Sequence, residues 1–391
     1  MKRRCLLNNK PTTKNLFLSF LRLGLTAFGG PAMVAHIREL STGRNQWLDE
    51  TDFKNGVALC QSIPGATAMQ TAAYVGLRVH GVFGAFAAYL GFGFPAFVLM
   101  LILSVIYARF SDLPRFISLF SGLQVIVVAI IFSSVYSFGR NIANNYRSLI
   151  IALLSALAFW EGISPFIAIV GAGAAGMAIS RVSVSKTSLD SDLRKTPSTA
   201  KQVTLIFVCF LSFFTALYIL NNKLFALGAV MLKIDIFAFG GGFASLPLML
   251  HEIVMDRGWL DSKTFMDGIA LGQVTPGPIV ITATFVGYLV YGLSGAVVAT
   301  IAIFSPSFFV LVIVAPFFDR LKNSVYFLRA IDGVFASFVG LLLYVCFKFA
   351  TTVPWDIVRI LLGLAALVAL IRKVDILYIV LAGAVISVFL L

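Results

Sequence analysis

Long apolar stretches are the feature that most constrains how this chain can fold. Thirteen such segments recur along the 391 residues, and only 12% of the residues are charged. About 20 apolar residues let a helix cross a bilayer, and within lipid only helices and closed barrels satisfy their own backbone groups. The sequence therefore predicts an all-α polytopic membrane protein and excludes a soluble domain. The segments are 16–35, 55–77, 82–107, 116–138, 148–160, 164–180, 203–221, 224–245, 266–290, 294–317, 325–347, 357–371 and 374–391.

The basic residues predict the orientation of these segments. The chain has 30 Lys and Arg residues, and such residues gather on the cytoplasmic side of membrane proteins. If the N-terminus is inside and all thirteen segments cross, twenty of these cations lie inside and eight outside. This predicts a cytoplasmic N-terminus and an outside C-terminus. Segments 148–160 and 357–371 are short, so ten to thirteen crossings stay open.

The sequence carries no motif for catalysis or for a cofactor. The four Cys residues are scattered, and the three His residues have no metal-ligand spacing. No G-x-x-x-x-G-K-[ST] phosphate-binding motif occurs. We therefore expect no metal, no cofactor, no ATP-driven pumping and no enzymatic activity.

An internal repeat divides the chain into two homologous halves. Phe28-Gly29-Gly30 recurs as Phe239-Gly240-Gly241 at a period of 211–212 residues, and Gln61-x-x-Pro64-Gly65 recurs as Gln273-x-x-Pro276-Gly277. The matches rest on Gly, Pro and Gln rather than on Leu and Ala, so they indicate a true repeat.

A single extra helix between the repeats inverts the second repeat relative to the first. Each repeat spans six segments, so the second begins on the opposite side from the first. Inverted repeats of this kind are the architecture of many secondary transporters. The predicted parts are a basic cytoplasmic N-terminus (1–15), the first repeat (16–180), a polar cytoplasmic linker (181–202), a connecting helix (203–223) and the second repeat (224–391).

A tripeptide in polar connections also recurs: Trp47-Leu48-Asp49 matches Trp259-Leu260-Asp261. Trp favours the membrane interface. We expect each Asp to cap the helix that follows it.

Matched backbone breaks interrupt corresponding segments. Gly29-Gly30-Pro31 corresponds to Gly240-Gly241-Gly242, and Ser62-Ile63-Pro64-Gly65 corresponds to Thr275-Pro276-Gly277-Pro278. Pro removes a backbone donor and Gly weakens a helix. The free N–H groups of half-helices suit an anion. The alternative is that these residues only kink helices or let them pack closely.

Two cations inside the predicted membrane segments are the more specific signal. Arg22 and Lys233 are 211 residues apart and are therefore counterparts. A cation in the hydrocarbon costs about 2.5–3.5 kcal/mol, so we expect the pair to face one central dianion. The alternatives are that Arg22 extends to the interface and that Lys233 pairs with Asp235.

Polar side chains near the breaks complete the candidate site. Gln61 and Gln273 each precede their Pro by three residues and could donate to an oxyanion, or they could hold helices together. Asp235 and Asp332 are the candidates for coupling transport to an ion. The predicted substrate-binding set is Arg22, Lys233, Gln61, Gln273, Gly29, Gly30, Gly240, Gly241, Pro64, Gly65, Pro276 and Gly277.

These motifs resemble a bidomain member of the chromate transporter (CHR) family, over nearly the whole chain. The first copy departs from the usual Pro-Gly-Pro of that family, because it has Pro64-Gly65-Ala66. The resemblance implies export of chromate across the plasma membrane, coupled to an ion gradient and giving chromate resistance. It rests on Phe28-Gly29-Gly30-Pro31, Trp47-Leu48-Asp49-Glu50-x-x-Phe53, Gln61-x-x-Pro64-Gly65, Val75-Gly76, Gly81-x-x-Gly84-Ala85, Phe94-Pro95 and Gln273-x-x-Pro276-Gly277-Pro278.

The expected partners are chromate or a related oxyanion and membrane lipid, with a homodimer left open and no nucleic acid. The expected mechanism is secondary active transport by alternating access, as in an antiporter. A passive anion channel, or a transporter of another oxyanion such as sulfate, is the alternative. Accumulation against a gradient separates the channel from the transporter. A mainly structural second repeat and an intramembrane enzyme are further alternatives.

Overall fold

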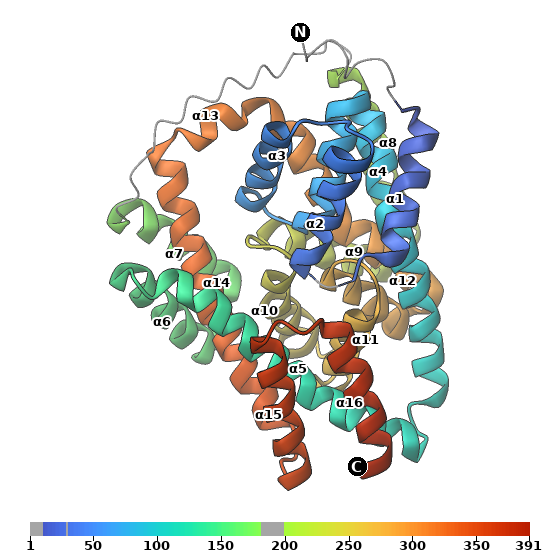
Figure 1. The fold of residues 1–391 in the computed structure, drawn as a ribbon, viewed down its shortest axis with the longest axis vertical. Coiled ribbons are helices and arrows are strands. Elements are labelled where there is room, and N and C mark those ends of the chain that lie inside the picture. The colour runs from blue at the N-terminus through green and yellow to red at the C-terminus, as the bar shows by residue number, and fades with distance from the viewer. Residues whose placement is uncertain (1–10, 29, 181–198) are drawn as a thin grey trace.

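The computed structural model describes residues 11–28, 30–180 and 199–391, and these ranges are helical apart from short connections, with no strand among them (Figure 1). The predicted all-α fold is confirmed. The first repeat contains α1 (Thr13–Thr26), α2 (Gly30–Arg38), η2 (Glu39–Arg44), α3 (Glu50–Ser62), α4 (Thr67–Phe110), α5 (Pro114–Ile142), α6 (Tyr146–Trp160) and α7 (Pro165–Ile179).

The second repeat follows the same order after the connecting helix α8 (Thr199–Leu220), and most of the predicted linker lies outside the described residues. Its elements are α9 (Asn222–Phe237), η3 (Gly242–Ala244), α10 (Ser245–Met249), η4 (Leu250–Asp256), α11 (Ser262–Val274), η5 (Ile279–Ile281), α12 (Thr282–Val314), η6 (Ala315–Phe317), α13 (Phe318–Lys322), α14 (Val325–Thr352), α15 (Ile357–Ile371) and α16 (Ile376–Leu390).

The predicted backbone breaks are present. Segments 16–35, 55–77, 224–245 and 266–290 are each split into two helical parts at their Gly and Pro residues. α1, for example, has 14 residues and is about 21 Å long, less than the roughly 30 Å of a bilayer core. None of these four segments is therefore a single straight helix that crosses the bilayer.

In segments 55–77 and 266–290, the two halves of the split segment fold back on each other. Gly56 of α3 faces the ring of Tyr74 of α4 so closely that a Cβ on Gly56 would lie 2.2 Å from the ring. Gly268 of α11 faces Phe285 of α12 in the same way, at 2.4 Å. In both pairs the residues lie on either side of the break. The break is therefore the tip of a helical hairpin.

α4 and α12 contain a further reversal. The chain leaves helical geometry at His80 and Gly81, where Gly81 has a φ of +66°. A Cβ on Gly84 would lie 2.5 Å from the carbonyl oxygen of Gly76, although a straight helix would hold these residues about 12 Å apart. Gly292 marks the same turn in α12. Each of these helices is thus a second tight hairpin.

Among the described residues, five helices are long and apolar enough to cross a membrane: α4, α5, α8, α12 and α14. α6, α7, α15 and α16 have 15 residues each, about 22 Å. α1 begins and α16 ends at opposite ends of the molecule in Figure 1. The number of crossings and the side on which each end lies stay predictions.

The repeats exchange their last helices. α5 packs against α15 and α16 of the second repeat, and α14, the counterpart of α5, packs against α6 and α7 of the first. Glycines allow the close approach, with Gly122 and Gly383 in one contact and Gly176 and Gly340 in the other. Reciprocal contacts are typical of copies related by a two-fold axis, and such an axis in the membrane plane would invert the repeats as predicted.

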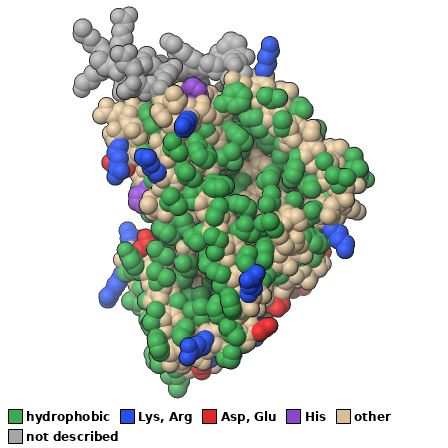
Figure 2. All heavy atoms as spheres, turned by 90° about the vertical axis from the view of Figure 1, so that its right-hand side faces the viewer, with side chains coloured by type: hydrophobic (Ala, Val, Ile, Leu, Met, Phe, Trp, Pro, Cys, Tyr) green, Lys and Arg blue, Asp and Glu red, His purple; other side chains and the backbone are tan. Residues whose placement is uncertain are grey.

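The outer surface is apolar, as expected of a protein in lipid. Hydrophobic side chains cover most of the face seen in Figure 2, and charged side chains on it are sparse. Only 6% of the apolar stretch of α8 is buried inside the protein.

The predicted helix caps are also confirmed. Asp49 accepts a hydrogen bond from Asp52 N at 2.7 Å, and Asp261 accepts one from Thr264 N at 2.8 Å.

Candidate functional site

The hairpin tips of the two repeats meet inside the protein. Gly65 N donates to Ala238 O at 2.9 Å, and Gly277 N donates to Ala27 O at 3.1 Å. Each bond joins the Pro-Gly tip of one repeat to the break after the first helix of the other. The relation is reciprocal, so the four breaks belong to one central structure.

Glycine is required at these tips. Gly65 and Gly277 have φ values of +116° and +114°, which L side chains rarely adopt. Both are buried, as are Pro64 and Pro276. The cross-repeat bonds satisfy N–H groups that the breaks would otherwise leave unpaired in the interior.

The tip after α9 touches both Pro-Gly tips. Gly240 and Gly241 have φ values of +102° and +92°. A Cβ on Gly241 would lie 3.4 Å from Thr67 Oγ1 of the first repeat, and one on Gly242 would lie 2.8 Å from Ile279 of the second. Of the corresponding pair in the first repeat, Gly29 lies outside the described residues and Gly30 opens α2.

Helix starts converge at these tips without side-chain caps. α4, η3 and η5 begin there, and their N-cap residues Ala66, Gly241 and Pro278 make no side-chain hydrogen bond to them. The first N–H groups of a helix have no partner within the helix and carry partial positive charge. The tips therefore offer donors to a negatively charged or acceptor-only ligand.

Asp235 lies next to this structure and is 1% exposed. Its Oδ2 accepts from Ser307 N at 2.7 Å and from Ser307 Oγ at 2.5 Å. Ser307 follows Pro306, which lies within α12. The other carboxylate oxygen, Oδ1, is buried and has no hydrogen-bond partner among the described residues.

The first repeat supplies the neighbours of Ser307. Gln70 Nε2 donates to Pro64 O at 2.6 Å and to Ser307 O at 3.3 Å, and Tyr89 OH donates to Phe304 O at 2.7 Å. Gln70 Oε1 is buried without a partner within the described ranges. Two unsatisfied acceptors in one buried cluster are unusual, because nearly all buried polar groups are bonded.

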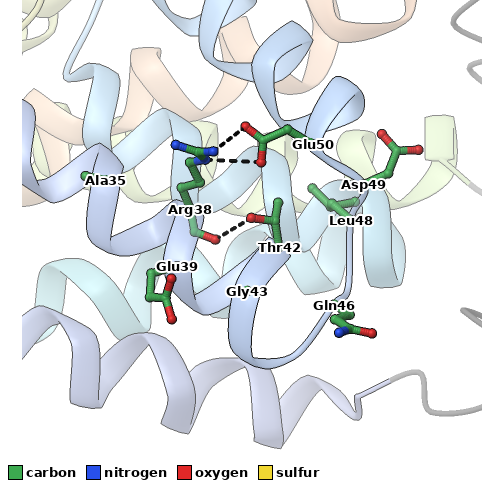
Figure 3. Close-up of a pocket in the computed structure, with 9 residues that line it drawn as sticks. All are labelled: Ala35, Arg38, Glu39, Thr42, Gly43, Gln46, Leu48, Asp49 and Glu50. Carbon is green, nitrogen blue, oxygen red and sulfur yellow. Dashed lines mark hydrogen bonds and ion pairs between the residues drawn. The ribbon is translucent and has the colours of Figure 1, made fainter.

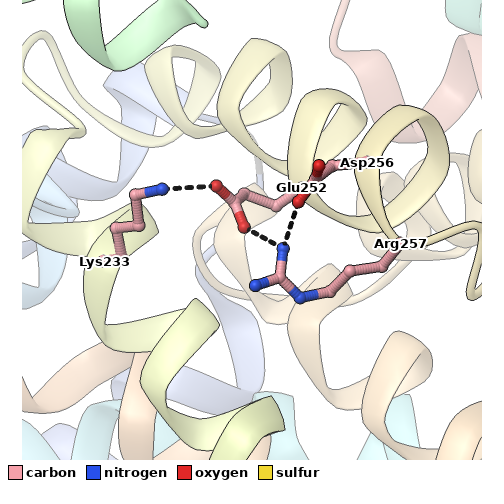
Figure 4. A network of polar contacts seen from close by, with 4 residues as sticks. All are labelled: Lys233, Glu252, Asp256 and Arg257. Atoms are coloured by element: carbon pink, nitrogen blue, oxygen red, sulfur yellow. Dashed lines mark hydrogen bonds and ion pairs between the residues drawn. The ribbon is translucent and has the colours of Figure 1, made fainter.

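Lys233 is paired with another carboxylate, that of Glu252 (Figure 4). Its Nζ lies 2.7 Å from Glu252 Oε1 and 3.9 Å from the centre of the Phe166 ring. Arg257 Nη1 contacts the other oxygen of Glu252 at 2.5 Å. The alternative pairing with Asp235 is therefore wrong: Lys233 bridges α9 to η4.

Arg22 and the two glutamines are placed differently from one another. The side chain of Arg22 is exposed. Gln61 is exposed. Gln273 is half-buried, and its Nε2 has no partner in the part of the chain that the structure describes.

Asp332 lies at the contact between α14 and the helices α6 and α7. Ser148 Oγ donates to Asp332 Oδ2 at 3.3 Å, and Ser180 Oγ does so at 2.5 Å. At the corresponding contact of α5 with α15, Arg359 donates to Ser121 at 2.8 Å. The positions of Ser121 and Asp332 correspond, so both residues fasten exchanged helices. A coupling role for Asp332 stays a prediction.

Asp267 was missed by the sequence analysis. It is 5% exposed in α11 and accepts from Tyr107 OH and from Gln124 Nε2, both at 2.8 Å. Both donors come from the first repeat. Its position near the start of the apolar segment 266–290 was the available signal, although the donors could not be identified from sequence.

A surface pocket of about 610 Å³ lies elsewhere, beside η2 (Figure 3). Arg38 is its one cation and is paired with Glu50 at 2.8 Å. Glu39 and Asp49 add two further carboxylates to its lining. Because its charge is negative, this pocket is a poor site for an oxyanion.

Most of the chain, including these tips, is similar to a known family of membrane proteins. The model of the family described as chromate transporter matches residues 14–177 and 225–388. The chain belongs to the chromate transporter family. The family model matches twice, so the two repeats are copies of one family unit. A transporter family points to a role other than catalysis.

Similar proteins from this family extend over most of the chain. An uncharacterized transporter of Methanocaldococcus jannaschii is 44% identical over 385 residues, which cover 98% of this chain and 96% of that protein. A chromate transport protein of Cupriavidus metallidurans is 31% identical and covers 92% of this chain and 88% of its own length. One of Pseudomonas aeruginosa is 32% identical and covers 84% and 78%. No solved structure matches.

Proposed function

We propose that this chain is a secondary active transporter that exports chromate or a similar tetrahedral oxyanion across the plasma membrane by alternating access, and so confers chromate resistance. The observation that carries the proposal is the pair of reciprocal bonds from Gly65 to Ala238 and from Gly277 to Ala27. They join uncapped half-helices of both repeats at one buried point. Relatives named chromate transport protein support the choice of anion.

The proposed substrate site lies at the four tips. Oxyanion oxygens only accept hydrogen bonds, and the tips present N–H groups at helix starts around Pro64-Gly65, Pro276-Gly277 and Gly240-Gly241. Gln61 and Gln273 supply amide donors, and in the sequence repeat Gly29-Gly30 are the counterparts of Gly240-Gly241.

Arg22 and Lys233 supply positive charge in this proposal. Glu252 has two cationic partners, so Lys233 can turn toward an anion while Arg257 continues to compensate that buried carboxylate. The side chain of Lys233 is 47% exposed, which leaves it room to move.

Alternating access in this proposal needs the tips to separate. The tips are linked across the repeats by single hydrogen bonds, each with a net value of about 0.5–1.5 kcal/mol, so they can part at modest cost while the exchanged helices stay packed. A membrane potential that is negative inside favours the exit of a dianion by about 2.3 kcal/mol per charge per 100 mV.

Asp235 is the stronger candidate for the coupling site. A buried carboxylate without a cationic partner is costly, so a proton or cation would accompany it. Its bond to Ser307, beside the Pro64 tip, links that event to the substrate site. Asp332 remains the weaker candidate because it lies at the edge of the helix exchange.

The test uses the purified full-length protein in liposomes with imposed pH gradients. The substrates are chromate, sulfate, molybdate, selenate and phosphate. Saturable accumulation of chromate against its gradient supports the transporter, whereas flux that only dissipates a gradient supports the channel alternative. A preference for sulfate would change the cargo and leave the mechanism intact.

A matched set of variants tests the cations separately. Arg22→Gln, Lys233→Gln and the double variant are expected to lower chromate uptake, and Lys223→Gln, which changes an exposed Lys on the same helix as Lys233, is the control. Uptake that is unchanged in the double variant would remove these residues from the site without affecting the assignment as a transporter.

A further inference from the structure

A second cavity, of about 580 Å³, lies where the two repeats exchange helices. It is lined by residues of α6, α7 and α14 and includes two arginines, Arg147 and Arg329. Arg147 is near the start of α6, Arg329 is near the start of α14, and Ser180 directly follows α7. Because three helix ends meet there, the cavity is at the level of the membrane interface rather than at the centre of the bilayer.

Within the described residues, neither arginine is paired with an acid. Arg147 Nε donates to Tyr146 OH at 3.0 Å, and its Nη1 donates to Ile179 O at 2.9 Å, both neutral groups. Arg329 Nε is buried and has no partner within the described ranges. Asp332, one turn further along α14, accepts instead from the hydroxyl groups of Ser148 and Ser180.

An uncompensated pair of guanidinium groups favours a phosphate. Arginine binds phosphate oxygens with two parallel hydrogen bonds, and basic pockets between membrane helices on the cytoplasmic side bind lipid headgroups. Both arginines lie on the predicted cytoplasmic side, next to the predicted linker. The chemistry of the cavity therefore fits the phosphate of a lipid or a free oxyanion.

The apolar part of the lining favours the lipid. Ile150, Leu154 and Ile179 line the same cavity, and each is about half exposed on the outer surface, at 50%, 60% and 49%. A free ion would make no favourable contact with these apolar side chains, whereas the acyl chains of a lipid would cover them. We propose that this cavity binds the phosphate headgroup of an anionic phospholipid, with its chains lying along α6 and the end of α7.

The bound lipid would fasten one repeat to the other. α6 and α7 belong to the first repeat and α14 to the second. At the corresponding contact of α5 with α15, Arg359 is paired with Asp356 and donates to Ser121. That arginine is already compensated, so the lipid site belongs to one of the two contacts.

Native mass spectrometry of the full-length protein in detergent tests the proposal. Phosphatidylglycerol and phosphatidylcholine are the probes, and Arg147→Gln/Arg329→Gln is the variant. Arg109→Gln, which changes an exposed Arg at the end of α4, is the control. We expect the wild type and the control to retain phosphatidylglycerol in preference to phosphatidylcholine, and the double variant to lose affinity for it by about tenfold or more.

Thermal unfolding of the same proteins gives a second readout. Added phosphatidylglycerol should raise the melting temperature of the wild type and of the control, but not that of the double variant. The proposal is overturned if the double variant retains phosphatidylglycerol, or if phosphatidylcholine binds equally well. It is also overturned if inorganic phosphate or sulfate displaces the lipid at equal concentration, because the cavity is then a site for free oxyanions.

Discussion

The contact of α9 with α12 in the second repeat and that of α1 with α4 in the first have the same backbone arrangement but different side chains. In the second repeat, Asp235 on α9 bonds to Ser307 on α12. The corresponding residues of the first repeat are Gly24 and Ala96. There α1 approaches α4 so closely that a Cβ on Gly24 would lie 2.5 Å from Phe92 O. The first repeat uses this position for packing, and the second uses it for a buried carboxyl.

The ion pairs around the first hairpins differ in the same sense. In the first repeat, Arg38 and Glu50 are paired on the surface, with 57% and 39% of their side chains exposed. In the second repeat, Glu252 is 2% exposed and is held by two cations. The two repeats thus have similar backbones but different charge distributions. The second repeat contains the buried carboxylates of Asp235 and Glu252, whose burial costs free energy.

The largest effect is expected at the Pro-Gly tips. Gly65→Ala would place a Cβ 1.9 Å from Ser307 Oγ at a φ of +116°, whereas Gly277→Ala would place one 2.9 Å from Ala96 Cβ. We expect the free energy of unfolding to fall by about 3–5 kcal/mol for Gly65→Ala and by about 1–3 kcal/mol for Gly277→Ala. Thermal unfolding in detergent measures both.

The control for this pair is Gly171→Ala in α7, where the new Cβ meets nothing within 4 Å. It should leave the melting temperature nearly unchanged or raise it slightly. Equal losses for the two tip variants would contradict the closer packing of Gly65, whose Cβ would meet Ser307 at 1.9 Å.

The next effect concerns the buried carboxylate of the second repeat. Glu252→Gln removes the anion shared by Lys233 and Arg257 and leaves Arg257 with Asp256 alone, so we expect a loss of stability of about 2 kcal/mol. Glu50→Gln removes a largely exposed pair and should cost less than about 1 kcal/mol. Chemical unfolding of both variants compares them, and a larger loss for Glu50→Gln would reverse the proposed asymmetry.

A transport measurement sharpens the comparison at Asp235. Asp235→Asn keeps the size of the side chain and an acceptor for Ser307 but cannot release a proton. We expect gradient-driven chromate accumulation to fall by at least about tenfold, with little change in the melting temperature. Ser307→Ala is the matched variant, since it removes one of the two donors to Asp235. Full accumulation by Asp235→Asn would exclude Asp235 as the coupling site.

The smallest effects are expected where the repeats exchange helices. Ser148→Ala leaves Asp332 with Ser180, and Ser121→Ala leaves Arg359 with Asp356. Each variant should lose about 1 kcal/mol of stability, which differential scanning calorimetry or thermal unfolding can resolve. If only one of them is destabilised, the two exchanged contacts are not equivalent.

Much of the local structure could be predicted from the sequence. The matched Gly and Pro residues predict breaks at Gly29-Gly30-Pro31, Ser62-Ile63-Pro64-Gly65 and Gly240-Gly241-Gly242. Helices end at or shortly before these motifs, at Thr26, Ser62 and Phe237. Asp49 and Asp261 act as the predicted caps. These features depend on a few neighbouring residues, so a sequence pattern contains them.

The arrangement of the site could not be predicted in the same way. The sequence places Lys233 two residues from Asp235, but Lys233 bonds to Glu252 and Asp235 bonds to Ser307, 72 residues away. Gln70 contacts Ser307 over 237 residues. The partners in such contacts are brought together by the folding of hairpins, which no local pattern specifies.

The sequence by itself determined that this protein is an all-α membrane protein made of two copies of one unit, because apolar length and the 212-residue spacing of Gly, Pro and Gln need no tertiary information. Only the tertiary structure decided that the split segments fold back as hairpins whose tips bond across the repeats. It also decided that Asp235 bonds to Ser307 and that Lys233 bonds to Glu252. The physical reason is that a buried polar group must find a partner, and which group it finds depends on how the hairpins pack.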